Sequence, residues 1–161
     1  MPIKADLDEI DWKILKELQD NGRITNVELA RRAGISAPPC LRRVRRLEEM
    51  GIIRGYRALL NGAALGQDLT AFCMVGLQRQ TDGDIKAFAE KTKGWPLVRR
   101  AWMMSGESDF LLYCVASDLN TFQTFVLEQL TTAPNVDTVR TALTIRQVKD
   151  EGLVLIGGDG V

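Results

Sequence analysis

The sequence GISAPPCLRRVRRLE, residues 34–48, decides how the N-terminal third of the chain is expected to fold. Ser36 is a residue type that caps helix N-termini, and Pro38 and Pro39 then fall in the first helical turn, where a missing N–H costs little. Apolar residues follow at helical spacing, at Cys40, Leu41, Val44 and Leu47. The stretch therefore predicts a helix that begins near residue 37 and carries arginines beside its apolar stripe.

Two further helix starts precede this stretch. Asp8 is placed to cap a first helix, and Thr25 with Glu28 forms a capping box for a second. Only residues 33–35 separate the second helix from the third, and Gly34 can supply the tight turn between them. Three capped helices with so short a turn predict a helix-turn-helix over residues 1–51. The expected apolar stripes are Ile10, Ile14, Leu15 and Leu18 in the first helix and Val27, Leu29, Ala30 and Ala33 in the second.

Charge is distributed unevenly along a chain whose formal net charge is zero. Residues 22–57 contain nine Arg, no Lys and three acidic residues, whereas residues 61–161 have a net charge of −3. A basic segment joined to an acidic one predicts a polyanion-binding module attached to a scaffold with another task. A solvated charged face is the alternative, but arginines on the third helix of a helix-turn-helix favour double-stranded DNA as the partner.

The DNA contacts are expected on this third helix, because recognition helices usually point their N-terminal ends into the major groove. That end is formed by Ser36, Ala37, Pro38 and Pro39. Arginine forks bind phosphates and the O6/N7 edge of guanine. We assign Ser36, Pro38, Pro39, Arg42 and Arg43 to bases or nearby phosphates, and Arg31, Arg45 and Arg46 to backbone phosphates.

Residues 52–67 are expected to form an extended linker strand, and residues 68–149 a second domain in which strands and helices alternate. The expected strands are Leu69–Gln78, Pro96–Met104, Asp109–Ala116 and Val136–Val148, and the expected helices are Asp84–Thr92 and Leu119–Leu130. This β-α-β-β-α-β order predicts an α+β domain with the ferredoxin-like arrangement and helices on one sheet face. Both faces of the first strand are apolar, so we expect another subunit to cover the second face. Residues 150–161 form a tail in which Leu153–Ile156 is a possible edge strand.

The composition argues against several other classes of protein. There is no histidine, and the three cysteines, Cys40, Cys73 and Cys114, are far apart, so no metal site, cofactor site or His-based catalytic group is expected. Buried cysteines that act as small apolar residues are the preferred interpretation. We expect no enzyme activity and no membrane span, and the N-terminus lacks the features of a secretory signal, which indicates the cytoplasm.

Several motifs occur in a fixed order from about residue 6 to residue 149. They are Leu7-Asp8-x-x-Asp11-x-x-Ile14-Leu15, Asn21-Gly22-Arg23-Ile24, Glu28-Leu29-Ala30, the stretch from Ser36 to Glu48, Gly51-x-Ile53-x-Gly55-Tyr56, Ser105-Gly106-x-x-Asp109, and Pro134-Asn135-Val136 before Thr141. In this order and spacing the chain resembles the Lrp/AsnC, or feast/famine, family of transcription regulators, and particularly its leucine-responsive members.

The resemblance implies a helix-turn-helix, winged or three-helix, followed by a βαββαβ domain of the RAM type that binds an amino-acid effector. It implies control of amino-acid metabolism genes by homodimers that assemble into tetramers or octamers. The family's effector pocket lies between dimers and is bordered by the glycine–aspartate loop. Carried onto this chain, the effector-binding residues are Met103, Met104, Ser105, Gly106, Glu107 and Asp109, with Thr131, Thr132, Thr141 and Leu143 as weaker candidates.

The chemistry of this loop is consistent with such a role. Backbone N–H groups near Gly106 suit the carboxylate of an amino acid, and Glu107 or Asp109 suits its ammonium group. The apolar residues Trp102 to Met104 favour leucine, another branched residue or methionine. A hairpin turn at Gly106 that Asp109 caps is the structural alternative. Two other functions stay open: an architectural DNA-bending regulator without an effector, and a small ferredoxin-like metabolite-binding module or enzyme.

Overall fold

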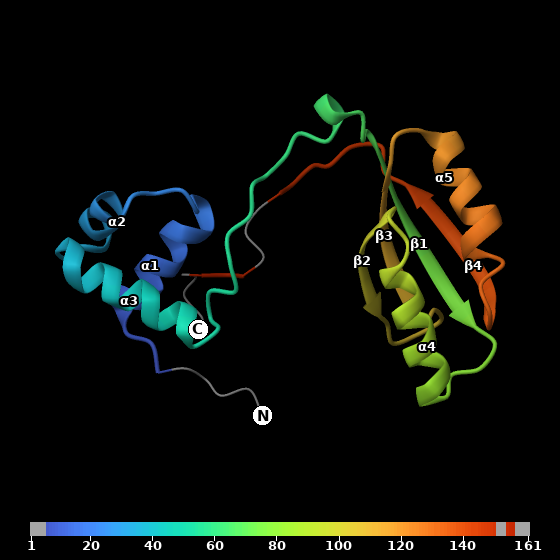
Figure 1. The fold of residues 1–161 in the computed structure, drawn as a ribbon, viewed down its shortest axis with the longest axis horizontal. Helices are drawn as coiled ribbons and strands as arrows, with labels where there is room; N and C mark the ends of the chain where they lie inside the picture. The colour runs from blue at the N-terminus through green and yellow to red at the C-terminus, as the bar shows by residue number, and fades with distance from the viewer. Residues whose placement is uncertain (1–5, 151–153, 157–161) are drawn as a thin grey trace. The chain divides into compact units, whose positions relative to one another are not determined.

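The computed structural model describes residues 6–150 and 154–156 and divides into two compact units (Figure 1). The N-terminal unit comprises residues 1–59 and 149–161, and the C-terminal unit comprises residues 60–148. In the part of the chain that the structure describes, no helix is long and apolar enough to cross a membrane.

The N-terminal unit is built from three helices, α1 (Glu9–Asp20), α2 (Asn26–Ala33) and α3 (Ala37–Glu49). Asp8 caps α1 in a reciprocal capping box with Asp11, and Thr25 accepts a hydrogen bond from the Glu28 N–H at the start of α2. Gly34 ends α2 at a φ of 76°, a left-handed conformation that glycine adopts without steric cost. These caps and the short turn confirm the predicted helix-turn-helix.

Four local expectations in this unit need correction. Thr25 caps α2, but the predicted capping box is only half formed, because the Glu28 carboxylate pairs with Arg31 and Arg32. Ser36 occupies the N-cap position of α3, but its side chain makes no capping hydrogen bond. Val27 is 71 % exposed and Leu41 is 40 % exposed, so neither belongs to the buried stripe. The buried apolar core of this unit consists of Ile14, Leu29, Ala30, Ala33, Cys40 and Leu47.

The linker after α3 is not a strand. Residues 52–67 form irregular backbone, with one 3-10 turn at Ala63–Leu65. In the tail, residues 154–156 likewise form no strand, and the rest of the expected edge strand, residue 153, lies outside the described residues. The main chain of Val154 instead exchanges two hydrogen bonds with the Gln19 side-chain amide of α1, at 2.7 and 3.2 Å.

The C-terminal unit contains a four-stranded antiparallel sheet with the order β2-β3-β1-β4. Its elements follow the chain as β1 (Leu69–Leu77), α4 (Asp82–Lys93), β2 (Val98–Met103), β3 (Phe110–Ala116), α5 (Leu119–Phe125) with a π-turn at Val126–Leu130, and β4 (Val136–Leu143). This order and pairing confirm the predicted ferredoxin-like α+β fold. β4 is shorter than expected, because Leu143 pairs with Ala71 and β1 begins only two residues earlier, at Leu69.

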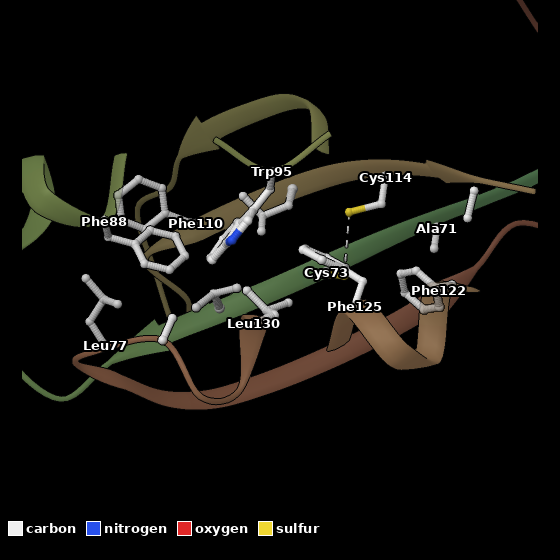
Figure 2. Packing of buried hydrophobic residues seen from close by; sticks show 14 residues of the cluster. Ala71, Cys73, Leu77, Phe88, Trp95, Phe110, Cys114, Phe122, Phe125 and Leu130 are labelled. Carbon is white, nitrogen blue, oxygen red and sulfur yellow. Dashed lines mark hydrogen bonds between the residues drawn. The ribbon is translucent and has the colours of Figure 1, made fainter. Parts of the chain in front are cut away.

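The core of this unit lies between the helices and one face of the sheet, where Cys73, Leu112 and Cys114 are fully buried (Figure 2). Trp95 packs edge-to-face against Phe88 and Phe125, with ring centroids 5.8 and 5.5 Å apart. All three cysteines are buried and unbridged, as predicted.

The opposite face of the sheet has no helix over it in the described chain. The register places Phe72 beside Tyr113, and Met74 beside Leu111 and Arg140, on this face. The rings of Phe72 and Tyr113 are 5.5 Å apart, and Trp102 of β2 lies next to Leu111. We call these five residues, Phe72, Met74, Trp102, Leu111 and Tyr113, the uncovered sheet face.

Candidate DNA-binding and effector-binding sites

One side of α3 is exposed and carries side chains suited to contact a ligand outside the unit. The exposed residues at helical spacing are Pro38, Leu41, Arg42 and Arg45, with Ser36 just before the helix. We call these five residues the exposed face of α3. Within the described chain Arg42 and Arg45 make no ion pair, so both guanidinium groups are available to an anionic partner. Ala37 and Pro39 are half-buried, and the Ala37 carbonyl accepts a hydrogen bond from the Asn26 amide at 2.8 Å.

The other two arginines of α3 lie toward α1. Nη1 of Arg43 is 2.7 Å from Oδ2 of Asp8 and 2.9 Å from Oδ1 of Asp11. Arg46 pairs with the second carboxylate oxygen of Asp11, whose side chain is only 1 % exposed. We call these four residues the α1–α3 ion-pair network. The structure thus separates Arg42 and Arg45 from Arg43 and Arg46, which the sequence had grouped together as DNA contacts.

The sequence interpretation named Asp11 only as part of a motif and missed its contacts with α3. A signal was present, because Asp11 precedes Ile14 by three residues and Leu18 by seven, on the helix face that becomes buried. A buried carboxylate needs a charged or hydrogen-bonding partner. Asp8 is more exposed than Asp11, but the hydrogen bond from the Asp11 N–H, and then Arg43, hold the pKa of the Asp8 carboxyl below the usual value.

Arg31, another predicted phosphate contact, lies at the end of α2 and makes a bidentate ion pair with Glu28 at 2.6 and 2.8 Å. Arg32 contacts Glu28 at 2.7 Å and Glu17 at 2.9 Å, and so ties α2 to α1. Hydrogen bonds from Arg31 and Arg32 lower the pKa of Glu28 to about 2. Arg31 stays 71 % exposed, so its ion pair does not remove it from the surface.

In the C-terminal unit, the predicted effector loop connects β2 to β3. Met103, Met104 and Ser105 are exposed, and Gly106 has a φ of 121°, which favours glycine. Glu107 is not free, because its carboxylate lies 3.3 Å from Nη1 of Arg140 on β4. The loop therefore combines exposed apolar side chains with backbone groups at a glycine turn.

Asp109, just before β3, makes hydrogen bonds to the end of β1. Its carboxylate Oδ2 accepts a hydrogen bond from the Leu77 N–H at 2.7 Å, and its own N–H donates to the Val75 carbonyl at 2.9 Å. Gln80 lies 3.4 Å from the same Oδ2. Asp109 therefore holds the end of β1, whatever further role it has.

The weaker effector candidates lie on other elements than the loop, although Thr141 follows Arg140, which Glu107 contacts. Thr132 donates its hydroxyl to the Glu128 carbonyl at 2.7 Å, at the end of the π-turn. Thr141 lies on β4, the edge of the sheet opposite β2. A separate hollow of about 410 Å³ is lined by Gln78, Arg79, Pro134, Asn135 and residues of α4, and it includes none of the predicted effector residues. Among the described residues, no cluster of His, Cys, Asp and Glu is placed to hold a metal ion.

Together the two units define a class of protein: a helix-turn-helix DNA-binding protein joined to a separate ligand-binding α+β domain. Residues 7–54 match the winged helix-turn-helix DNA-binding family, and residues 70–154 match the Lrp/AsnC ligand binding domain. The chain belongs to the Lrp/AsnC family of transcription regulators, as the sequence motifs predicted.

Relatives and solved structures agree with this assignment. The chain is 72 % identical over 150 residues to the leucine-responsive regulatory protein of Rhizobium meliloti (strain 1021), covering 93 % of this chain and 96 % of that protein. It is 38 % identical to the protein of the same name from Escherichia coli (strain K12), covering 94 % and 92 %. A transcriptional regulator of Neisseria meningitidis, solved with L-methionine, superposes with a TM-score of 0.86 at 39 % identity, covering 90 % of this chain and 94 % of that one. E. coli AsnC, at 21 % identity and a TM-score of 0.83, shares the fold and covers 92 % and 99 %.

Proposed function

We propose that this regulator contacts DNA with the exposed face of α3 and that its affinity for DNA or its assembly changes when it binds an amino acid. The observation that carries the first part is the placement of Arg42 and Arg45. Both are exposed, without an ion pair in the described chain, and on the helix that follows the tight turn at Gly34. Guanidinium groups in this position suit guanine edges and phosphates, and Ser36 and Pro38 lie at the end that enters the groove.

The proposed effector is a small amino acid with an apolar side chain: leucine, another branched residue or methionine. Two solved relatives support this class, the N. meningitidis regulator at 39 % identity and a feast or famine regulatory protein of M. tuberculosis at 31 %, both in complex with L-methionine. The proposed site is the loop from Met103 to Asp109. Thr132 and Thr141 lie on other elements than this loop, so they would contribute from a neighbouring strand or from a second copy.

We propose homodimers that form through the uncovered sheet face and assemble further into tetramers or octamers. Phe72, Met74, Leu111 and Tyr113 are only half-buried on that face, and a second copy would remove them from water. A dimer also presents two copies of α3 to two half-sites. The proposed targets are genes of amino-acid metabolism, and the proposed place of action is the cytoplasm.

A second candidate function, an architectural DNA-bending regulator without an effector, is favoured by the acidic groups of the loop. Asp109 accepts the Leu77 N–H, and Glu107 pairs with Arg140, so both candidate acceptors for an ammonium group already have partners. An amino acid would have to displace one of these contacts or bind through backbone carbonyls.

The two candidates are separated by measuring thermal stability and mass by light scattering, with each of the twenty amino acids at millimolar concentration. Ligand binding to the native state raises its stability. A shift produced by leucine or methionine, together with a change in mass or DNA affinity, supports the effector. The absence of any shift for all twenty amino acids favours the architectural function.

Two loop variants then test the site itself. Glu107→Gln removes the acceptor charge and the Arg140 pair without affecting β1, whereas Asp109→Asn also weakens the contact to the Leu77 N–H. We expect Asp109→Asn to abolish the amino-acid shift while DNA affinity stays within about twofold of wild type, a difference below roughly 0.5 kcal/mol. A normal response in both variants would remove the loop acids from the effector site.

A further inference from the structure

α3 carries four arginines between residues 42 and 46, but they fall into two groups of different chemistry. Arg42 and Arg45 face outward, whereas Arg43 and Arg46 are held by carboxylates of α1. Asp11 is central to this arrangement, because each of its two oxygens contacts a different guanidinium and its side chain is 1 % exposed. The two arginines are less buried than their partner, with exposed fractions of 29 % and 48 %.

A carboxylate and a phosphate compete for the same guanidinium donors. Both present paired oxygens to the planar fork, and charge-assisted pairs of this kind are strong. Asp11 therefore occupies two arginines on the helix that is proposed to contact DNA. Since Arg43 and Arg46 retain exposed surface, a phosphate could reach them if Asp11 did not hold them.

We propose that Asp11 is a specificity-determining residue, which keeps Arg43 and Arg46 from DNA phosphates and so limits sequence-independent binding. The inference rests on the proposed function, because it assumes that α3 lies against DNA. Asp11 acts through the two arginines and is in this sense a positioning residue. Its carboxylate leaves Arg42 and Arg45 as the arginines of α3 that contact DNA.

The physical consequence concerns discrimination between sequences rather than affinity alone. Phosphate contacts strengthen binding to every duplex, whereas contacts to base edges strengthen binding to the matching one. Two additional phosphate contacts would tighten binding to random DNA and narrow the ratio between specific and non-specific affinity. Each one also steepens the plot of log affinity against log salt by about 0.9.

The test is Asp11→Asn in the full-length protein, with two duplexes as probes: one selected in vitro for tight binding to wild-type protein, and one of random sequence. We expect the variant to bind the random duplex several-fold more tightly at low salt, with a salt slope steeper by about 1 to 2. The ratio between selected and random duplex falls. Unchanged or weaker binding to random DNA with an unchanged slope overturns the proposal, since a purely structural role lowers affinity without adding phosphate contacts.

Asp8→Asn provides a second variant in case Asp11→Asn fails to fold. Asparagine caps helices as well as aspartate does, so the N-cap of α1 is retained while the charge beside Arg43 is lost. We expect the plot of log affinity against log salt to steepen, but less than in Asp11→Asn, because Arg43 keeps its contact with Asp11. If Asp11→Asn cannot be purified folded, an unchanged slope in Asp8→Asn counts against the proposal.

Two controls isolate the cause. Asp20→Asn removes the same charge from the exposed end of α1, away from the ion-pair network, and a slope as steep as that of Asp11→Asn would assign the effect to net charge and overturn the proposal. Arg42→Ala tests the underlying assumption. If it changes neither affinity nor slope, the proposed DNA contact by α3 fails; if it weakens binding while Asp11→Asn leaves the slope unchanged, only the inference about Asp11 fails.

Discussion

Different kinds of interaction stabilise the interior of each of the two units. The C-terminal unit buries fourteen apolar residues, including Phe88, Trp95 and Phe125 in one aromatic group, and its sheet is fixed by pairing along β1. Among its described residues, the N-terminal unit has a core of six buried apolar residues, of which Ala30, Ala33 and Cys40 are small. Its third helix is joined to the first through the buried carboxylate of Asp11 as well as through apolar contacts.

This difference indicates how each unit tolerates change. A large apolar core loses stability in proportion to the volume removed from it, whereas a small core beside a charged surface also depends on ion pairs. The N-terminal unit must present cations to DNA and bury enough apolar surface to fold, with few residues for either purpose. Asp8 and Asp11 supplement this small core, because their ion pairs with Arg43 and Arg46 connect α1 to α3.

The largest expected effect is the loss of a core leucine. Leu112→Ala removes a fully buried side chain from the C-terminal unit and is expected to lower its free energy of unfolding by about 2–5 kcal/mol. Leu47→Ala makes the same change in the smaller core of the N-terminal unit, where we expect DNA binding to be lost before the sheet unfolds. Hydrogen exchange in urea, followed separately in each unit, measures both.

Leu127→Ala is the matched control, because this leucine of the C-terminal unit is 66 % exposed and should change stability by less than about 0.5 kcal/mol. If Leu47→Ala destabilises its unit no more than the control does, the N-terminal unit does not depend on its apolar core, and the account of it as stabilised by apolar contacts together with ion pairs is wrong.

A smaller effect separates the two groups of arginines in α3. Arg42→Ala is expected to weaken binding to a selected duplex by about 1–3 kcal/mol and to reduce the salt slope by about 1 if the lost contact is to phosphate. Arg43→Ala leaves a carboxylate of α1 with fewer partners, so it should lower the melting temperature of the N-terminal unit with little change in slope. Fluorescence anisotropy over a salt series, with melting curves for each variant, distinguishes the two results. Equal slopes for both variants would contradict the separation.

Sequence reasoning succeeded where local chemistry decides the structure. The caps at Asp8 and Thr25 and the turn at Gly34 depend on near neighbours in the chain, and the structure has all three. The second half of the predicted capping box at Thr25 is absent, because the Glu28 carboxylate pairs with Arg31 and Arg32. The end of β4 depends on a distant partner instead. The alternating pattern of the last strand continues to Val148 in the sequence. In the structure, β1 begins at Leu69, so residues of the last strand after Thr144 have no β1 backbone to pair with.

The candidate sites show the same limit. The sequence identifies the arginine-rich helix but not which arginines face α1, because that depends on the packing angle between two helices. It identifies Asp109 as a candidate acceptor, with turn chemistry as the alternative, but the contact to the Leu77 N–H arises only when β1 and β3 are adjacent. Whether Asp109 also contacts an effector stays a prediction.

The smallest expected effect concerns the ion pairs that Glu28 makes with Arg31 and Arg32 on α2. Hydrogen bonds from Arg31 and Arg32 lower the pKa of Glu28 from its usual 4.5 to about 2. Because the folded pKa lies below the unfolded one, the charged form favours the folded state above pH 4.5, and this contribution is lost as the pH falls toward 2. The Glu28 side chain is 34 % exposed, so solvent weakens these ion pairs and we expect a slight effect on stability that added salt reduces.

The measurement is an NMR titration of the Glu28 side-chain carboxyl, with Glu28→Gln compared in acid unfolding. Below pH 4.5 the free energy of unfolding of Glu28→Gln should fall less than that of the wild type, because the variant has no Glu28 carboxylate to protonate. The α1–α3 ion-pair network stays intact in both proteins. A Glu28 pKa near 4.5 would show that the contacts of Glu28 with Arg31 and Arg32 do not form in solution, which would leave Arg32 with Glu17 alone. Arg31 would then be available to DNA, as Arg42 and Arg45 are. Arg43 and Arg46, which Asp8 and Asp11 contact, would be the arginines still held by carboxylates.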